Sequence, residues 1–252
     1  MEIKSPLVSI VVPTYKPRYF EAALQSALLQ TYQNIEILIS DDCPTQDIQD
    51  IISRYLPYSP KPVRVIRNEP GLGGLMNYTQ CVTEARGQFV KFLNDDDILM
   101  PTCVERMIGV FLQYPSVSLV TSRRLLIDGA GRTLPYIQAT RCPFPGDRLV
   151  NGRDLISYLA DYQMNFIGEP STVMFRREHL VDVKPNVCCL QGETIRAIND
   201  LAMYVNVLTH GDFAYLVEPL SCFRQHEEQR QQQSDILELW KKAVVLFSRQ
   251  IK

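Results

Sequence analysis

Three features that would assign the chain to a particular protein class are missing from its 252 residues. No apolar run approaches the ~18 residues that a membrane-spanning helix needs. The first residues, MEIKSPLVSIVVP, lack the basic start, the longer apolar stretch and the small-residue cleavage site of a secretion signal. An excess of positive charge is missing too: the formal net charge is -2, which argues against a nucleic-acid partner held by a basic surface.

A disulfide-forming cysteine pattern is also lacking. The seven cysteines are an odd number, are scattered, and include no CxxC pair. This pattern is typical of reduced thiols rather than of a disulfide framework. Cys188 and Cys189 are adjacent, which favours loop packing over redox chemistry. Together, these absences predict a soluble cytoplasmic protein without a membrane span.

What the sequence does contain is a regular alternation of strand and helix patterns in its first half. Short apolar runs that predict buried strands lie at 8–12, 35–40, 63–66, 88–93 and 117–121. Helical spacing of apolar residues lies between them, at 19–31, 46–55, 75–86 and 102–113. Strand and helix repeats of this length predict an α/β fold with a mostly parallel sheet and right-handed crossover connections.

The second half has a weaker pattern. Residues 129–152 carry several Gly and Pro and indicate turns or short hairpins. Strands are expected over 171–175 and 214–217, and helices over 153–161, 199–209 and 235–249, the last of which contains Trp240. We expect this half to form an irregular layer against the first, so that residues 1–252 make a single domain.

Polar side chains collect where four of the predicted strands end. They are Thr14 and Tyr15, Asp41 and Asp42, Asn68, and the run Asp95 to Asp97. Carboxyl ends of parallel strands meet at one edge of a sheet, and ligands bind there. Three adjacent carboxylates repel one another unless a cation joins them or the tip is solvated as a turn and helix N-cap. The pattern alone leaves both alternatives open.

These segments resemble a known family. SIVVPTY, SDD, NEPGLGGLMN and FLNDDDILMP, followed by GEPSTVMFRRE, NDLAMY and PLSCFRQHEEQ, are similar in order and spacing to family 2 glycosyltransferases with the GT-A fold. The resemblance implies a Rossmann-like sheet flanked by helices. It further implies that residues 1–122 bind a nucleotide sugar and that residues 123–252, with a C-terminal helix, form the acceptor side.

The activity that the resemblance implies is inverting, metal-dependent transfer of a sugar from a UDP-, GDP- or dTDP-sugar to an acceptor hydroxyl. The QxxRW motif and the membrane helices of processive synthases are absent from the sequence, which favours transfer of a single sugar. A glycan or lipid-linked acceptor, cell-surface glycan biosynthesis, and a location in the cytoplasm or at the inner face of the membrane are implied in the same way.

Metal and diphosphate contacts follow from the resemblance as well. Asp96 corresponds to the ligand of Mn²⁺ or Mg²⁺, and Asp95 to a ribose contact, although Asn94 departs from the usual aspartate. Asp97 is either a second ligand or a helix cap. Such a cation would offset the charge that develops on the departing diphosphate. His226 resembles a late histidine that reaches the metal, with a plain surface histidine as the alternative.

The nucleotide pocket is implied by the same motifs. Asp41 corresponds to the aspartate that accepts a hydrogen bond from the base, and Asp42 is either part of the pocket or a turn residue. The glycines of PGLGG let the backbone approach the nucleoside or simply make a tight turn. The residues expected to frame this pocket are Pro13, Thr14, Tyr15, Gly73 and Asn77.

Inversion requires a general base on the face opposite the leaving group. The family carries it in an acidic pair that opens a helix, and its counterpart here is Asp200, with Asn199 and Tyr204 as departures from the usual acid and tryptophan. A residue favoured there by the helix dipole is a compatible interpretation. Glu169 is assigned to the donor or acceptor pocket, or to a buried ion pair, and Arg224 to a phosphate.

Three other functions are weighed against this one. A nucleotidyltransferase would carry a glycine-rich, basic loop after the first strand, where this chain has PTYKP. A receiver-type signalling domain would be about half as long and would phosphorylate an aspartate after the third strand, where this chain has Arg67 and Asn68. A transferase that has lost turnover and only binds its donor stays open because of Asn94 and Asn199.

Overall fold

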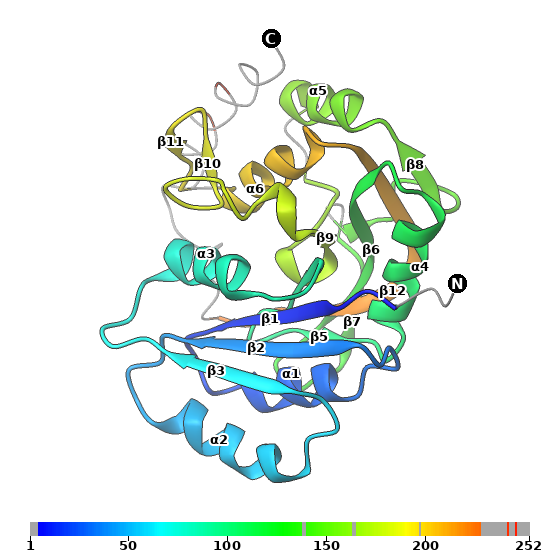
Figure 1. Cartoon of the computed structure of the whole chain (residues 1–252). Helices are drawn as coiled ribbons and strands as arrows, with labels where there is room; N and C mark the ends of the chain where they lie inside the picture. Colours follow the sequence, from blue (N-terminus) through cyan, green and yellow to red (C-terminus); the bar gives the residue numbers. More distant parts are fainter. Residues whose placement is uncertain are drawn as a thin grey trace.

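The computed structural model describes residues 5–137, 140–162, 165–196 and 198–227, together with positions 241 and 245. A mixed ten-stranded sheet forms the centre, and its main path has the strand order β3-β2-β1-β4-β9-β6-β12-β5 (Figure 1). The expected C-terminal helix over 235–249, with Trp240, lies outside the described residues apart from 241 and 245.

The first half builds the parallel part of this sheet. Its strands are β1 (Val8–Thr14), β2 (Ile35–Asp41), β3 (Val63–Arg67) and β4 (Phe89–Phe92). Its helices are α1 (Phe20–Leu28), α2 (Asp47–Tyr55), α3 (Gly74–Glu84) and α4 (Cys103–Gln113), with a 3₁₀ turn η1 at Leu56–Tyr58. Strands β1, β2 and β4 are buried at every position, which explains their continuous apolar runs.

The second half continues the same sheet. Strands β6 (Val117–Ile127), β9 (Met174–Arg176) and β12 (Asp212–Arg224) belong to it, with β9 antiparallel between β4 and β6 and with β12 parallel to β6. The short strands β5 (Ile98–Leu99), β7 (Thr133–Leu134) and β8 (Arg148–Val150) pair antiparallel with β12 or β6.

A layer of further elements covers this part of the sheet. It consists of α5 (Gly152–Tyr162), α6 (Asn199–Leu208), the hairpin β10 (Cys189–Leu190) and β11 (Glu193–Thr194), and the 3₁₀ turns η3 (Pro170–Thr172) and η4 (Arg177–His179).

Three expected boundaries were wrong. The strand predicted over 117–121 runs to Ile127, and the strand predicted over 214–217 extends from Asp212 to Arg224. The strand predicted over 171–175 is a 3₁₀ turn followed by the shorter β9. Polar residues conceal these extents: Arg124 in β6 is buried because it finds an ionic partner that is distant in sequence.

Two hydrophobic cores lie on the two faces of the sheet. Along β1, Val11 packs with α3, α5 and α6, whereas Val8, Ile10 and Val12 pack with α1, α2 and α4. This alternation follows from the two-residue period of a strand. Within the described residues, no helix is long and apolar enough to span a membrane.

Candidate active site

A cavity of about 690 Å³ opens at the carboxyl ends of β1, β2 and β4. Its lining is made by residues that follow these strands and by the start of α3: Pro13, Thr14, Tyr15, Lys16, Asp42, Gly71, Gly73, Gly74, Asn77, Tyr78, Asn94, Asp95 and Asp96. Seven of the predicted site residues are therefore brought together, namely Pro13, Thr14, Tyr15, Gly73, Asn77, Asp95 and Asp96.

Asp95 joins the loop after β1 to the acidic run. One carboxylate oxygen accepts the backbone N–H of Tyr15 at 2.8 Å and that of Lys16 at 2.9 Å. Burial raises the pKa of the Asp95 carboxyl to about 6, against the opposing effect of these two N–H donors. Asp95 also lines the cavity.

Asp41 departs from its expected role. Its carboxylate is fully buried, pairs with Arg67 at 2.7 Å, and accepts hydrogen bonds from Gln49 at 2.7 Å and from the N–H of Cys43 at 2.9 Å. It is not among the residues that line the cavity, whereas Asp42 is. Arg67 and the other partners hold the Asp41 carboxylate inside the fold, and of the two aspartates only Asp42 borders the cavity.

Asp42 orders the glycine turn before α3. It accepts the N–H of Leu72 at 3.0 Å and the N–H of Gly73 at 2.8 Å, and also the side-chain amide of Asn68 at 2.8 Å. Next to it, Asn77 donates to two backbone carbonyls, while its buried Oδ1 finds no partner among the described residues. An unsatisfied buried acceptor in a cavity wall is free to accept from a ligand.

Asp97 lies apart from the cavity lining. It is fully buried, and its Oδ1 accepts the backbone N–H of Arg224 at 3.0 Å. Burial, and then the charge of Asp96, raise the pKa of the Asp97 carboxyl well above its usual range. Its contacts fasten β12 to the loop after β4, so Asp97 is better placed to support the loop than to ligate a metal.

A cation of the protein itself lies beneath this acidic loop. Lys91 in β4 is fully buried, and its ammonium group donates to the carbonyl of Phe92 at 3.0 Å and to that of Ser171. Burial lowers the pKa of Lys91, and the charge of Asp97 opposes that decrease. Resident positive charge thus offsets part of the repulsion in the aspartate run, so the run alone is no evidence for a metal.

Arg224 has a structural position instead of the expected phosphate contact. It is buried, donates from Nε to the carbonyl of Asp96 at 2.8 Å and from Nη1 to that of Asp128 at 3.0 Å, and lies over the ring of Tyr19 at 4.5 Å. It does not line the cavity. A planar guanidinium suits this clamping of several backbone segments.

Asp96 and His226 form the pair best suited to hold a metal. Oδ2 of Asp96 lies 3.0 Å from Nε2 of His226, whose other ring nitrogen is buried without a hydrogen-bond partner in the described part of the chain. Carboxylate oxygens suit Mg²⁺ and Mn²⁺, and an imidazole nitrogen favours Mn²⁺ of the two. Over residues 5–137, 140–162, 165–196 and 198–227, no group of three or more His, Cys, Asp or Glu could hold the ion unaided, so phosphate and water would supply the remaining ligands.

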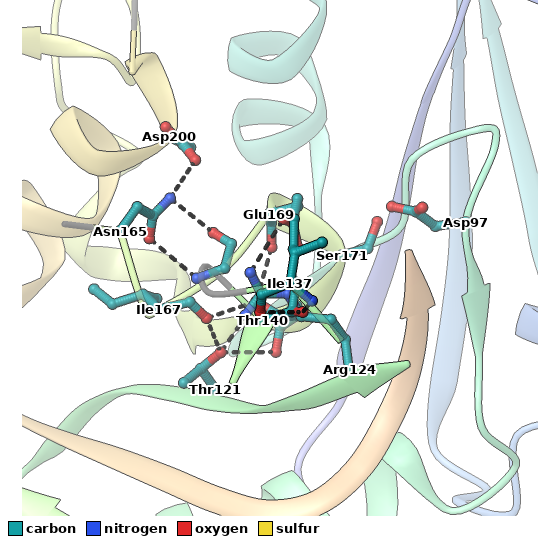
Figure 2. Close-up of polar contacts among 12 residues, drawn as sticks. Asp97, Thr121, Arg124, Ile137, Thr140, Asn165, Ile167, Glu169, Ser171 and Asp200 are labelled. Carbon is teal, nitrogen blue, oxygen red and sulfur yellow. Dashed lines mark hydrogen bonds and ion pairs between the residues drawn. The ribbon is translucent and has the colours of Figure 1, made fainter. Parts of the chain in front are cut away.

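Asp200 stands at the start of α6, on the second-half side of the sheet. One oxygen accepts a hydrogen bond from the N–H of Leu201 at 2.9 Å. The other accepts one from Nδ2 of Asn165 at 2.9 Å (Figure 2). Burial raises the pKa of Asp200 to about 6, and the charge of Glu169 adds to this increase. Ile198, two residues before, has a left-handed φ of 49°, a strained conformation that is frequent at functional sites.

Glu169 is held by an ion pair. Its Oε2 lies 2.8 Å from Nε of Arg124, whose side chain is 2% exposed, while that of Glu169 is 17% exposed (Figure 2). The ion-pair interpretation of Glu169 is thus observed, and the charge of Glu169 also raises the pKa of Asp200. It is not part of the lining of the 690 Å³ cavity.

Sequence reasoning missed two groups that the geometry makes important. Lys91 could have been found from the sequence, since a lysine inside the apolar run FVKF predicts a buried cation next to the aspartate run. Asn165 carried none, because it lies in the irregular half and meets Asp200 only through the folded chain.

Residues 9–183, more than half of the chain, match the sequence profile described as Glycosyl transferase family 2. The chain belongs to this family. A Mycobacterium tuberculosis protein described as uncharacterized is 32% identical over 185 residues, which cover 70% of this chain and 56% of that protein. The putative teichuronic acid biosynthesis glycosyltransferase TuaG of Bacillus subtilis is 27% identical over 212 residues, which cover 83% of this chain and 75% of that one.

Solved structures share the fold of this family 2 chain. The S. aureus TarS fragment 1–349 in complex with UDP-GlcNAc superposes with a TM-score of 0.71 at 17% identity, covering 96% of this chain and 66% of that one. Mannosyltransferase PcManGT from Pyrobaculum calidifontis, in complex with GDP-Man and Mn²⁺, gives a TM-score of 0.59 at 14% identity, covering 90% and 59%. The fold is of the GT-A type, and the chain spans only about half to two thirds of the length of several of these proteins.

Proposed function

We propose that this chain transfers a single sugar from a nucleotide diphosphate sugar to an acceptor hydroxyl, with inversion at the anomeric carbon. One observation carries the proposal: seven residues predicted from family motifs line a single cavity at the carboxyl edge of the sheet. A cavity of about 690 Å³ is within the usual size of a small-ligand site.

Donor binding rests on the polar groups of that cavity. Asp42 and the free Oδ1 of Asn77 would accept hydrogen bonds from the nucleoside, and Asp95 would accept one from a ribose hydroxyl. We propose Asp42 rather than Asp41 for the contact with the base, because Asp42 lines the cavity and Asp41 does not. UDP-, GDP- and dTDP-sugars are all compatible with this cavity. Two structural neighbours are complexes with UDP-GlcNAc and with GDP-Man.

Asp96 and His226 would hold a divalent cation, Mn²⁺ or Mg²⁺, beside the diphosphate. When bound, such a cation supplies positive charge that offsets the negative charge of the leaving diphosphate. Asp97 keeps the loop that carries Asp96 in place through Arg224. The structural neighbour PcManGT is a complex with GDP-Man and Mn²⁺, which supports this part of the proposal.

Asp200 is the proposed general base. The acceptor oxygen forms a bond to the anomeric carbon as the bond to the diphosphate breaks, and Asp200 takes the proton of the attacking hydroxyl. Its pKa of about 6 leaves it ionised at neutral pH while keeping it more basic than an ordinary aspartate. Glu169 lies near enough to influence Asp200 and would border the sugar or the acceptor.

The acceptor is proposed to be a glycan or a lipid-linked glycan, and the process to be cell-surface glycan assembly. The Bacillus subtilis relative supports this, since it is described as a putative teichuronic acid biosynthesis glycosyltransferase. We place the reaction in the cytoplasm or at its membrane surface. The seven free thiols, six of them buried, suit a reducing compartment.

A donor panel tests the proposal. Purified protein is titrated with UDP-, GDP- and dTDP-sugars, with and without Mn²⁺, and donor hydrolysis and transfer are followed. We expect one nucleotide to bind in a Mn²⁺-dependent manner and to be turned over. Binding without turnover would support a transferase that only binds its donor, and binding indifferent to Mn²⁺ would contradict the metal assignment.

Substitution at the metal pair sharpens the test. Asp96→Ala is expected to abolish the Mn²⁺-dependent part of donor binding, measured by calorimetry, because it removes the one cavity-lining carboxylate of the pair. Asp47→Ala is the matched control, since Asp47 is an exposed aspartate in the first turn of α2. Unchanged Mn²⁺ dependence in Asp96→Ala would remove Asp96 from the metal site.

A further inference from the structure

The geometry around Asp200 assigns a second residue to the proposed reaction. We propose that Asn165 is a positioning residue, which holds the Asp200 carboxylate ionised and in one rotational orientation. The inference rests on the proposed role of Asp200 as general base. Asn165 precedes the GEPS segment and lies outside every motif that the sequence indicated.

Three hydrogen bonds determine the orientation of the Asn165 amide. Its Oδ1 accepts the N–H of Gly168 at 3.1 Å, so its NH₂ group must face the other way. That group donates to Oδ2 of Asp200 at 2.9 Å and to the carbonyl of Gly168 at 3.3 Å (Figure 2). The amide is therefore anchored by backbone on one side and presents only a donor to Asp200.

A pure donor selects the ionised form of its partner. An NH₂ group stabilises a carboxylate oxygen but cannot accept a proton from a carboxylic acid. Oδ1 of Asp200 is fixed separately by the N–H of Leu201 at 2.9 Å. With one donor on each oxygen, rotation of the carboxylate is blocked, and each oxygen keeps one lone pair for an incoming proton.

The anchor of Asn165 is itself rigid. Gly168 has a φ of 108°, and a Cβ there would lie 2.7 Å from Oγ1 of Thr172. The carbonyl of Gly168 also accepts a hydrogen bond from the hydroxyl of Tyr204 at 3.1 Å, and Tyr204 lies one helical turn after Asp200 on α6. The turn and the helix are thus tied at two points, Asn165 to Asp200 and Gly168 to Tyr204.

The charged and titratable surroundings oppose the role of Asn165. Burial and the charge of Glu169 raise the pKa of Asp200, whereas the N–H of Leu201, the backbone N–H of Asp200 itself and the Asn165 amide lower it. The Cys188 thiol and the Tyr204 hydroxyl also lie near, and burial, followed by the Asp200 charge, raises the pKa of each. Neither offers a positive charge to Asp200, so N–H donors stabilise its ionised form, and Asn165 is the one side chain among these donors.

The test measures the protonation of Asp200 directly. The side-chain carboxyl of Asp200 is titrated by ¹³C NMR in the intact protein and in Asn165→Ala. Loss of a hydrogen bond to a charged group is expected to raise the measured pKa of Asp200 by about 1 or more. In parallel, turnover should fall about 10- to 100-fold with the donor KM unchanged, and the acid limb of the pH profile should move upward.

Two further variants keep the result interpretable. Asn165→Asp preserves shape and fold and is expected to raise the pKa of Asp200 further, because a second carboxylate then faces it. Asn206→Ala is the matched control: Asn206 lies on the same helix and donates to the carbonyls of Val187 and Cys189, not to Asp200. It should leave the titration of Asp200 unchanged.

The two proposals fail in different ways. An unchanged Asp200 titration in both Asn165 variants would overturn the positioning role, whatever the activity. Absence of sugar transfer in the wild-type protein, with the titration shifted as expected, would instead contradict the proposed function and leave the contact between Asn165 and Asp200 established.

Discussion

At Asp200, burial and hydrogen bonding act in opposite directions on one carboxylate. Burial raises its pKa to about 6, while donors on both oxygens keep the ionised form accessible at neutral pH. A base of this kind is stronger than an exposed aspartate and is still deprotonated where the enzyme would work. The surroundings of Asp200 therefore provide what the proposed proton transfer requires.

The first prediction concerns this residue. Asp200→Asn is expected to lower turnover by a factor of at least ~100, because the acceptor proton loses its destination. Donor affinity, measured by calorimetry, should stay nearly unchanged because Asp200 is not among the cavity-lining residues.

Asp154→Asn serves as its control. Asp154 is also an aspartate in the first turn of a helix, but it is exposed and lies on α5. Its turnover should match that of the wild type. Normal turnover in Asp200→Asn would exclude Asp200 from the mechanism.

Lys91, in the first half of the chain, is a second charged group that is buried and held by hydrogen bonds. A fully buried ammonium group donates to the carbonyls of Phe92 and Ser171, and the hydroxyl of Ser171 accepts the N–H of Asn94 at 2.9 Å. The acidic loop is thus connected to the turn before β9 through a buried cation. This connection orients Asn94 and its neighbours before any ligand binds.

At the scale of elements, close backbone contacts join α5, α6 and the sheet. A Cβ at Gly152, the first residue of α5, would lie 2.1 Å from the carbonyl oxygen of Gly211 and 2.5 Å from that of Leu208. Gly211 in turn approaches the carbonyl of Ser116 just before β6. Because these neighbours are backbone atoms, they cannot move aside as a flexible side chain would.

The second prediction follows from this contact. Gly152→Ala is expected to lower the free energy of unfolding by about 1–3 kcal/mol, the usual cost of overpacking, as measured by urea denaturation. Gly109→Ala is the control, since Gly109 lies in the exposed part of α4 with no atom within 4 Å of an added Cβ. It should raise stability by roughly 0.5–1 kcal/mol.

Equal effects of the two substitutions would contradict this account of the packing. The same comparison has a functional side, because α6 carries Asp200. A shift of α6 in Gly152→Ala should lower turnover more than it changes donor binding.

At the scale of the molecule, one sheet joins the first half of the chain, residues 1–122, to the second half. Strand β6 is continuous across residue 122, and β9 and β12 from the second half share the sheet with β1 and β4. The two hydrophobic cores on its faces each include residues of both halves. The 690 Å³ cavity and Asp200 are therefore held by one continuous framework.

The third prediction concerns how the turnover of the whole protein depends on pH. At saturating donor, turnover should fall as the pH decreases through about 6, because protonated Asp200 cannot accept a proton. The profile is measured from about pH 5 to about pH 9. A rate independent of pH over the acid range would contradict the assignment of Asp200 as base.

Much of the first half could be predicted from sequence because β1, β2 and β4 are buried at every position and are short, mostly apolar runs. The meeting of Thr14, Asp42, Asn77 and Asp95 at one edge follows from parallel strand order. The sequence did not distinguish Asp41 from Asp42, because adjacent aspartates at a strand end point to opposite sides. The ion pair with Arg67 identifies Asp41 as the aspartate that points away from the cavity.

The sequence by itself determined the alternation of strands and helices, the carboxyl edge where a ligand would bind, and the family to which the chain belongs, because local periodicity and motif order are carried by neighbouring residues. Only the tertiary structure decided which carboxylates line the cavity, that Asp41 pairs with Arg67, that Asp97 accepts the backbone N–H of Arg224, and that Asn165 meets Asp200. Burial and ionic pairing depend on residues that are distant along the chain, and their effect on a carboxylate exists only once the fold brings them together.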